Sequence, residues 1–486
     1  MIKKITLDYF KAFQHAEIEI KPLTILVGPN NGGKTSLLHS ILLIKQTLDM
    51  NGQEILKLNS DVNFGEFENI VNQESDQKEI RLKFDFEEYD RFLDVTFTKE
   101  DDNLIVKNFS CNTGELEYTL VNTKMIKQGS EIRCYPENYW IKSKYRNIDE
   151  DLIRDINPAF QGNSFLITPQ IPPENFDLLS QYLLSIEEDM RMNRSLYYHK
   201  DLEKGELSFK NNVRSIQLLT SLMKYTSQFN NIIREEFNDI LYLGPIRNTA
   251  ERSYNQGHYN HVGFKGENTA PIIEESPNYI KKGLINILKR LDIAKSIETV
   301  NINKKSFELK LLTDNTISPV NFADVGCGTS QILPIIVQLL IPRINSMLIF
   351  EQPETHLHPK VQAELASLLV DLLKGKIGFL PEKPIDPDGL SASKLKNKTK
   401  YLIETHSDYF IERIRYHIAK GDISTDDVFI YYIEPDEVKR GSKPIKIQIN
   451  SKGQYYNIPQ GYSTNFRMKE TKNMTDILLK NLSENE

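Results

Sequence analysis

The sequence predicts an α/β fold, and three observations support this prediction. A glycine-rich segment, GPNNGGKTS at residues 28–36, lies between an apolar segment suited to a β-strand and a segment with apolar residues at helical spacing. Two later apolar segments, at 347–350 and 401–403, end directly in acidic residues. Buried strands of α/β sheets place such acids at the edge where ligands bind. Strand-like segments also dominate from about 79 to 133, which predicts an additional antiparallel sheet.

The composition is that of an ordinary globular protein. The 486 residues are 39 % hydrophobic and 26 % charged, and the length suggests roughly two to four domains. No apolar run approaches the ~18 residues that span a bilayer, and the N-terminus alternates as a strand does, so neither a membrane span nor a signal peptide is expected. The three cysteines (Cys111, Cys134 and Cys327) have neither metal-site spacing nor a disulfide framework, which favours the cytoplasm.

The segment 28–36 has the spacing G-x-x-x-x-G-K-[ST], with Gly28, Gly33, Lys34 and Thr35 at the fixed positions. Glycines allow a tight turn in which several backbone N–H groups point at one anion. Lys34 adds a positive charge for the β- and γ-phosphates, and the Thr35 hydroxyl is placed to bind Mg²⁺. We therefore predict a nucleoside triphosphate site. Its expected contacts are Gly28, Asn30, Asn31, Gly32, Gly33, Lys34, Thr35 and Ser36.

The first half of the chain reads as a lobe followed by an insertion. Residues 2–27 predict three short strands, and the helix after the glycine-rich segment extends to about residue 49. From about 149 to 241 the pattern turns helical, but it is too short and too poor in heptads for a long coiled coil. We predict an N-terminal lobe at 1–148, a compact helical insertion at 149–241 and a C-terminal lobe at 242–486.

Two arginines follow the insertion. Arg247 and Arg252 come after a Gly-Pro turn, and they are either solvated or involved in linking the nucleotide or the fold. Further along, residues 376–400 are polar, with prolines early and lysines late, which predicts an exposed loop. Its basic end leaves contact with nucleic acid open.

The second half supplies three more polar features of a nucleotide site. A glycine-rich turn at 322–331 precedes a helix predicted at 332–340, and a helix N-terminus with Ser330 near its cap can hold a phosphate. Glu351 ends a buried strand, where an acid can orient Mg²⁺ or act as a base. His406 follows the next strand and can sense the γ-phosphate.

Taken together, these motifs resemble a known group of proteins. GPNNGGKTS, DVGCGTSQILP, MLIFEQPETHLHP and YLIETHSD, in this order, look like the ABC-type ATPases of the overcoming-lysogenization-defect and chromosome-maintenance kind. The sequence is most similar to the prokaryotic AAA-family ATPases often found in anti-phage systems. Residues 5–48 also look like that group, as do the segments YLGPIRNTAERSY and NIPQGY. The helical insertion and the basic loop are not covered by the resemblance.

The resemblance implies a fold and an assembly. The fold is a P-loop NTPase of the ABC-ATPase type, with a mixed central sheet, an antiparallel β lobe and an inserted helical subdomain. Such ATPases pair head to tail and sandwich two ATP molecules, so Gly326, Gly328 and Ser330 would reach the γ-phosphate of the partner. His406 would be the switch histidine, and Glu351 would be the metal-side acid that binds Mg²⁺ with Thr35.

One position departs from the family pattern. The residue after the metal-side acid is normally a glutamate that polarises the attacking water, and here it is Gln352. Glutamine orients water but cannot take a proton. Glu354 supplies the base instead if the turn at Pro353 directs it inward. The catalytic set is therefore Lys34, Glu351, Gln352, Glu354 and His406, and we expect slow hydrolysis of ATP to ADP and phosphate.

Three functions follow from different classes of protein. The favoured hypothesis is a cytoplasmic ATP-dependent sensor or regulator in anti-phage defence, acting as a homodimer or higher oligomer on a separate nuclease or toxin. The alternative is a DNA-binding repair or recombination ATPase, which the net charge of −7 and the lack of a long coiled coil disfavour. An ATP-dependent nuclease is less expected, because Asp426, Asp427, Glu434 and Asp436 make no convincing metal cluster. A transporter subunit is a weaker fourth reading.

Overall fold

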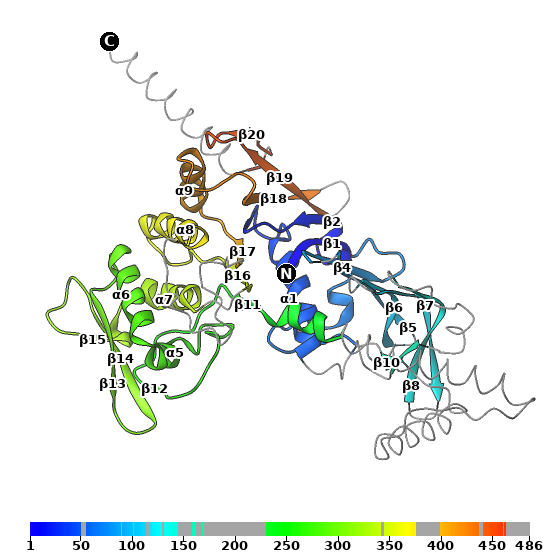
Figure 1. Cartoon of the computed structure of the whole chain (residues 1–486), viewed down its shortest axis with the longest axis horizontal. Coiled ribbons are helices and arrows are strands. Elements are labelled where there is room, and N and C mark those ends of the chain that lie inside the picture. The colour runs from blue at the N-terminus through cyan, green and yellow to red at the C-terminus, as the bar shows by residue number, and fades with distance from the viewer. Residues whose placement is uncertain are drawn as a thin grey trace, which may run out of the picture. The chain divides into compact units, whose positions relative to one another are not determined.

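The computed structural model of the chain describes most of both predicted lobes (Figure 1). The described residues are 1–49, 55–88, 90–100, 102–112, 116–128, 131–143, 158–161, 168–169, 230–341, 345–375, 399–436, 441–459 and 461–462. Their contacts divide the chain into two units that interleave in sequence. The first unit contains Met1, Ala16–Leu38 and Asp239–Glu486, and the second contains Ile2–His15 and His39–Asn238.

The first unit is built on a seven-stranded mixed sheet. Its order is β11-β16-β17-β3-β18-β19-β20, with the first five strands parallel and the last two antiparallel. The strands β3, β16 and β17 are buried at every residue, as expected for parallel strands covered on both faces. Their bounds are β3 Leu23–Val27, β11 Ile240–Leu243, β16 Met347–Glu351, β17 Lys400–Glu404, β18 Val428–Asp436, β19 Gly441–Ile449 and β20 Tyr455–Asn457.

The helices of this unit contribute to its hydrophobic core. They are α1 Lys34–Asp49, whose first turn belongs to the first unit, α5 Thr269–Glu275, α6 Asn278–Arg290, α7 Cys327–Leu340, α8 Pro359–Leu373 and α9 Asp408–Ala419. α8 and α9 lie side by side, and the Arg413 guanidinium of α9 bonds the Glu364 carboxylate of α8 at 2.7 Å (Figure 1). Among the described helices, none has the length and apolarity that a bilayer crossing needs.

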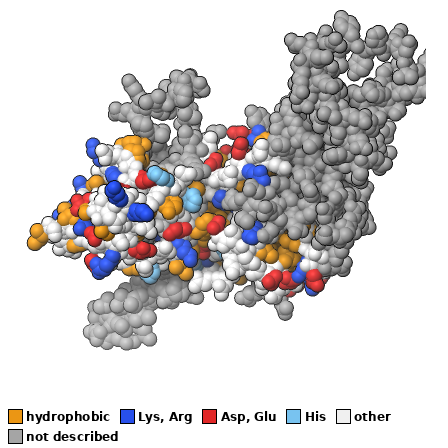
Figure 2. Space-filling model, turned by 90° about the horizontal axis from the view of Figure 1, so that it is seen from below, with side chains coloured by type: hydrophobic (Ala, Val, Ile, Leu, Met, Phe, Trp, Pro, Cys, Tyr) orange, Lys and Arg blue, Asp and Glu red, His pale blue; other side chains and the backbone are white. Residues whose placement is uncertain are grey.

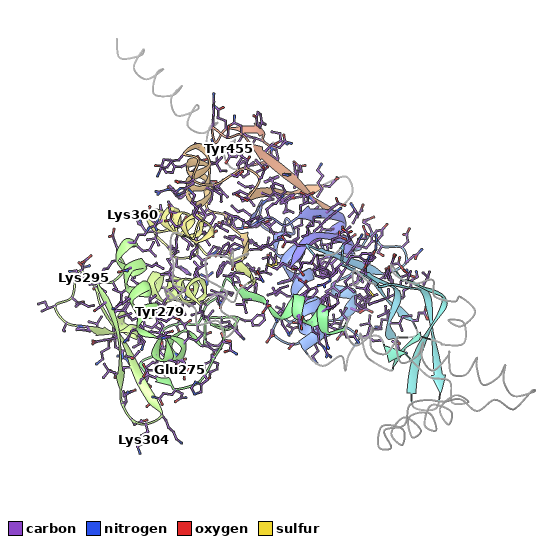
Figure 3. All side chains as sticks on the ribbon, in the orientation of Figure 1. Glu275, Tyr279, Lys295, Lys304, Lys360 and Tyr455 are labelled. Carbon is purple, nitrogen blue, oxygen red and sulfur yellow. The ribbon has the colours of Figure 1, made fainter. Side chains whose placement is uncertain are left out.

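A small antiparallel sheet completes the first unit. It contains β12 (Tyr254–Asn255), β14 (Ser306–Leu312), β13 (Ser296–Asn301) and β15 (Val320–Asn321), which pairs with β14. β13 and β14 pair as an antiparallel hairpin. Lys304 lies at its tip, exposed to solvent (Figure 3).

The second unit carries the antiparallel sheet that the sequence predicted. Its nine strands run in the order β10-β9-β8-β7-β6-β5-β4-β1-β2. Side chains of β4 alternate between buried and half-buried, which is the pattern of a sheet with one face on the core. The bounds are β1 Ile2–Phe10, β2 Phe13–Glu19, β4 Ile80–Phe86, β5 Phe92–Glu100, β6 Asn103–Asn112, β7 Leu116–Gln128, β8 Glu131–Ser143, β9 Pro158–Gln161 and β10 Thr168–Pro169. An α/β fold with a mixed sheet and an antiparallel sheet is thus confirmed.

Two element boundaries differ from the sequence predictions. Residue 240, predicted to be helical, begins strand β11, because Ile240 pairs with Met347 of β16. The helix predicted at 332–340 begins at Cys327, with Gly326 as its N-cap. Its first turn consists of small and polar residues, which apolar periodicity does not detect. Ser330 therefore lies inside the helix and not at its cap.

Several predictions fall on residues outside the described part of the chain. These are most of the helical insertion at 149–241 and nearly all of the loop at 376–400. The division into lobes at 148/149 and 241/242 therefore stays a prediction.

Candidate functional site

The glycine-rich segment connects strand β3 to helix α1 through a loop that only glycine permits at two positions. Gly28 and Gly33 have φ angles of +147° and +101°, which side chains rarely adopt. A Cβ on Gly28 would also lie 2.6 Å from the Ile433 carbonyl oxygen of β18. Asn30 and Asn31 are exposed in the loop, Gly32 is buried, and Ser36 lies in the first turn of α1. The residues predicted to contact the nucleotide therefore form one continuous turn at a helix N-terminus.

Lys34 lies over this turn. Its Nζ donates to the carbonyl oxygens of Gly28 at 3.1 Å and Pro29 at 2.8 Å, and it lies 3.9 Å from the Glu404 carboxylate. The side chain is only 3 % exposed. Burial lowers the pKa of Lys34, while the Glu404 carboxylate opposes that shift. The ammonium is thus held inside the loop that is shaped for an anion.

Two carboxylates meet Thr35 at the ends of adjacent strands. Glu351 of β16 and Glu404 of β17 are paired in register. The Thr35 hydroxyl donates to the Glu404 carboxylate at 2.9 Å and lies 3.5 Å from the nearer oxygen of Glu351. Burial raises the pKa of Glu351, and burial together with the Glu351 charge raises the pKa of Glu404 to about 7. Glu404 was missed as a site residue, because its proximity to Glu351 depends on strand order.

Tyr242, also missed from sequence, holds the other side of Glu351. Its hydroxyl donates to the second carboxylate oxygen of Glu351 at 2.6 Å. Burial raises the pKa of Tyr242, so the phenol stays protonated and remains a donor. Tyr242 comes from β11, the strand that pairs with β16.

The turn after β16 directs Glu354 inward. Gln352 has a φ of +45°, its backbone N–H donates to the Glu404 carbonyl at 2.8 Å, and its side chain is partly exposed. Glu354 is 9 % exposed, and its carboxylate accepts the backbone N–H of His406 at 2.6 Å. Burial raises the pKa of Glu354. This orientation is the one that the base hypothesis for Glu354 requires.

Arg247 links the acid-bearing turn to the glycine-rich helix. The side chain is 3 % exposed, and its NH2 donates to the carbonyls of Glu351 at 3.1 Å and Gln352 at 3.2 Å. The Gln331 amide of α7 donates to the Arg247 carbonyl at 3.4 Å. Burial lowers the pKa of Arg247 to about 10, so it keeps its charge at neutral pH. The sequence left open whether each arginine is solvated or links parts of the structure. Arg247 links the turn after β16 to α7, whereas Arg252 is exposed.

The glycine-rich helix presents its N-terminus differently from the prediction. Gly326 is exposed, and nothing lies within 4 Å of a Cβ built on it. At Gly328 a Cβ would lie 2.9 Å from the His356 carbonyl oxygen, so a close backbone approach requires glycine there. Ser330 is buried, and its hydroxyl donates to the Cys327 carbonyl at 2.7 Å. The Ser330 hydroxyl is therefore engaged within its own helix.

His406 lines a hollow of about 320 Å³ beside the loop. Residues 28–30 form one wall, residues 405–408 form another, and Tyr432 and Tyr462 complete it. Burial, with a smaller contribution from the Lys34 charge, lowers the pKa of His406. A neutral imidazole at the edge of the loop can donate one hydrogen bond to a phosphate oxygen.

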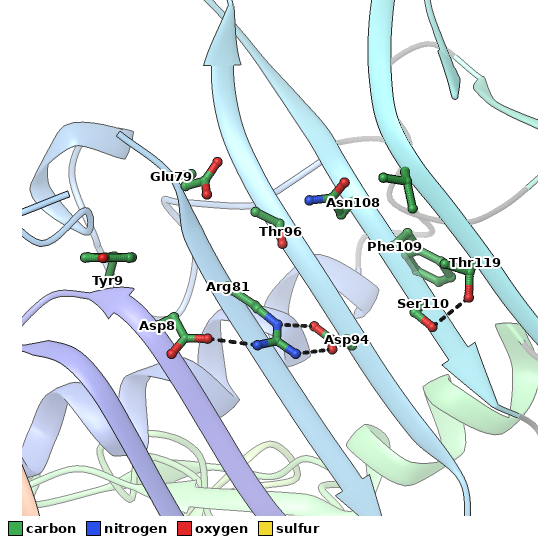
Figure 4. A pocket seen from close by; sticks show the side chains of 11 residues that line it. Asp8, Tyr9, Glu79, Arg81, Asp94, Thr96, Asn108, Phe109, Ser110 and Thr119 are labelled. Atoms are coloured by element: carbon green, nitrogen blue, oxygen red, sulfur yellow. Dashed lines mark hydrogen bonds and ion pairs between the residues drawn. The ribbon is translucent and has the colours of Figure 1, made fainter. Parts of the chain in front are cut away.

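A second hollow of about 330 Å³ lies on the antiparallel sheet of the second unit (Figure 4). The Arg81 guanidinium lies between two carboxylates, bonding Asp8 at 3.0 Å and Asp94 at 2.6 and 2.8 Å. Because both acids already pair with this cation, the hollow does not offer Arg81 to a phosphate.

The first site fits Mg²⁺ when a nucleotide supplies the remaining ligands. Among the described residues there is no group of three or more His, Cys, Asp or Glu that could hold a metal ion without other ligands. The Thr35 hydroxyl and the carboxylates of Glu351 and Glu404 are nevertheless hard oxygen donors. Mg²⁺ is usually bound by one or two carboxylates together with substrate phosphates.

Comparison with known proteins gives one family match. The sequence matches the AAA ATPase domain family over residues 1–411. A search of curated proteins found no match.

Three solved structures resemble the chain at low similarity. The Smc head domain with an extended coiled coil, bound to the C-terminal domain of ScpA, from Pyrococcus furiosus has 11 % identity and a TM-score of 0.38, covering 92 % of this chain and 96 % of that one. The SMC head domain from Thermotoga maritima has 10 % identity and a TM-score of 0.35, with coverages of 92 % and 99 %. The recombination mediator protein RecF has 10 % identity and a TM-score of 0.29, with coverages of 92 % and 98 %. Similarity at this level supports no inference about what the chain binds.

Proposed function

Because the chain belongs to the AAA ATPase domain family, we propose that it binds ATP with Mg²⁺ at residues 28–36 and hydrolyses ATP to ADP and phosphate. One observation carries the proposal. The loop, Lys34, Thr35 and the carboxylates of Glu351 and Glu404 gather in one site at the carboxyl ends of parallel strands. Phosphoryl transfer needs positioning and charge neutralisation more than covalent chemistry, and this set supplies both.

Each residue has a distinct role in this proposal. Loop N–H groups and the Lys34 ammonium bind the β- and γ-phosphates, and the Thr35 hydroxyl contributes a metal ligand. A bound Mg²⁺ would neutralise charge on the phosphate oxygens. Neutral His406 donates to the γ-phosphate from the hollow next to the loop.

Hydrolysis is slow because Gln352 occupies the position of the usual base. Its amide orients water but accepts no proton. Glu354 is the replacement base, supported by its inward orientation and raised pKa, although one of its oxygens is occupied by the His406 N–H. A base held in this way by main chain has little freedom to follow the water, which also favours low turnover.

We further propose that two copies pair across ATP. The exposed N-terminus of α7, at Gly326, supports this pairing. The helix is fourteen residues long, and the positive end of its dipole lies at this N-terminus, where it can attract an anion. In the conformation described here, backbone amides near Gly326 and Gly328 are better placed than the Ser330 hydroxyl to contact the partner's γ-phosphate. ATP would then favour the paired state, as a ligand that binds one of two states more tightly.

The biological role that we propose is a cytoplasmic sensor or regulator of a separate effector in prokaryotic anti-phage defence. Its support is the order and spacing of the motifs. Direct binding of nucleic acid is less favoured, since the net charge is −7. Figure 2 shows Lys and Arg side chains interspersed with Asp and Glu among the described residues visible on that face.

Two measurements test this function. Purified chain should release phosphate from ATP slowly, and duplex DNA should not stimulate the rate; a strong, salt-sensitive stimulation by DNA would favour the repair ATPase instead. Purification of the tagged chain from its native operon, with and without ATP, followed by mass measurement, should recover a dimer or larger assembly together with an effector. A chain that stays monomeric and alone in both conditions would contradict the proposal.

A further inference from the structure

We propose that Glu404 is a positioning residue for the metal: it accepts a hydrogen bond from the Thr35 hydroxyl and shares with Glu351 the acidic side of the Mg²⁺ site. The inference rests on the proposed ATP site and adds to it a second acid, on a different strand. In the sequence pattern, Glu351 alone has this role.

The hydrogen bonds distinguish the two acids. The Thr35 hydroxyl lies 2.9 Å from one Glu404 oxygen and 3.1 Å from the other, but 3.5 Å from Glu351. Glu351 is instead held by the Tyr242 hydroxyl at 2.6 Å. The better acceptor for Thr35 is therefore Glu404.

This arrangement matters for a metal ligand. A hydroxyl has one proton and two lone pairs. When its hydrogen is donated to the Glu404 carboxylate, the lone pairs of the Thr35 hydroxyl are left available to bind a metal ion. A carboxylate in this place thus orients Thr35 in the way that second-shell groups orient metal ligands.

The charge balance gives an independent argument. Three carboxylates, those of Glu351, Glu354 and Glu404, are nearly buried. Among the described residues, the nearly buried cationic side chains that act on them are those of Lys34 and Arg247. Glu404 is 1 % exposed, and the Lys34 ammonium, 3.9 Å away, donates its bonds to loop carbonyls. Burying such an excess of negative charge is unfavourable unless a carboxyl takes up a proton or a cation balances the charge. A divalent cation that arrives with ATP supplies this balance.

A purely structural acceptor for Thr35 would not need a charge. Glutamine has nearly the same shape as glutamate and also accepts a hydrogen bond. Glu404→Gln therefore separates the two roles, because it retains an acceptor for Thr35 and removes the negative charge. The exposed Glu298→Gln on β13 makes the same chemical change away from the site and serves as the control.

The experiment measures metal and nucleotide binding rather than activity. Mn²⁺ replaces Mg²⁺, and free Mn²⁺ is measured by electron paramagnetic resonance in the presence of the chain and saturating ATPγS. Second-shell substitutions typically weaken metal affinity about 10–100-fold, and we expect a loss in that range for Glu404→Gln. Calorimetric affinity for ATPγS in EDTA should be unchanged or tighter, since a negative charge has been removed. Glu298→Gln should behave as the unsubstituted chain.

The possible outcomes separate this inference from the proposed function. If the unsubstituted chain fails to bind ATPγS, the ATP site itself is wrong. If it binds ATPγS with Mn²⁺ and Glu404→Gln retains the Mn²⁺ affinity within twofold, only the role of Glu404 is wrong. Should Glu404→Gln fail to fold, Glu404→Asp is the second variant. It retains the negative charge, but its side chain is one methylene shorter, so the carboxylate lies farther from Thr35. It is expected to weaken Mn²⁺ binding at least fivefold, and unchanged affinity would overturn the inference.

Discussion

Replacing Gly28 by alanine tests whether the loop geometry is what makes the site. A Cβ at this position would lie 2.6 Å from the Ile433 carbonyl oxygen, and the φ of +147° is strained for any residue with a side chain. Such backbone strain costs about 1–3 kcal/mol, and overpacking typically costs about 1–3 kcal/mol more. Ile433 belongs to β18, which pairs with β3, so the carbonyl cannot retreat without disturbing the central sheet.

We therefore expect Gly28→Ala to lower the free energy of unfolding by about 2–6 kcal/mol and to weaken nucleotide binding. Gly326→Ala is the matched control for the free energy of unfolding, because nothing lies within 4 Å of its Cβ and its backbone is ordinary for an N-cap. It should cost less than about 1 kcal/mol. Nucleotide binding of Gly28→Ala is compared with the unsubstituted chain, since Gly326 is itself proposed to approach the partner's phosphate. Urea denaturation and titration with a fluorescent ATP analogue measure both effects. Equal stability of the two variants, with nucleotide binding intact in Gly28→Ala, would refute the reasoning.

Further predictions concern the base and the fold. Gln352→Glu should raise ATP turnover about tenfold or more, because it restores a proton acceptor, whereas Glu354→Gln should lower turnover. Phosphate-release assays measure both rates. Brisk turnover that survives Glu354→Gln would contradict the assignment of the base. Hydrogen bonds from Lys374 and His417 hold the pKa of Asp422 below its usual range. Because the pKa of Asp422 is lower in the folded chain than its unfolded value of 3.8, ionised Asp422 stabilises the fold above pH 3.8. This stabilisation is lost as the pH falls below 3.8 toward the pKa of the folded chain. Asp422→Asn should therefore lower the Tm at pH 6, and the difference from the unsubstituted chain should shrink below about pH 4. A difference that grows on acidification would exclude this contribution.

The elements closest to the motifs were predictable from sequence because their signals are local. The strand-like pattern from about 79 onward predicted the region in which β4 begins at Ile80, and the glycine-rich spacing located the start of α1. Buried strands such as β16 and β17 are continuous apolar runs bounded by polar residues, which short-range patterns detect well. The antiparallel sheet of the second unit followed from the same alternation.

The parts of the site that were missed depend on the order of strands. Tyr242 and Glu404 flank Glu351 only because β11 and β17 are the two neighbours of β16, and that order cannot be deduced from periodicity. Arg247 was ambiguous for a related reason, since a loop arginine is usually solvated and only the packed fold shows what it touches. Ser330 was misplaced because a helical turn made of small and polar residues has no apolar period.

The central claim is that Lys34 and its loop bind the triphosphate. Titration of the unsubstituted chain, Lys34→Ala and the exposed control Lys304→Ala with ATPγS and Mg²⁺ in a calorimeter tests it most directly. Removing a charge-assisted hydrogen bond costs about 1.5–3 kcal/mol, so Lys34→Ala should weaken affinity about 10–100-fold while Lys304→Ala leaves it unchanged. Equal affinities for all three proteins, or no binding to the unsubstituted chain, would contradict the claim.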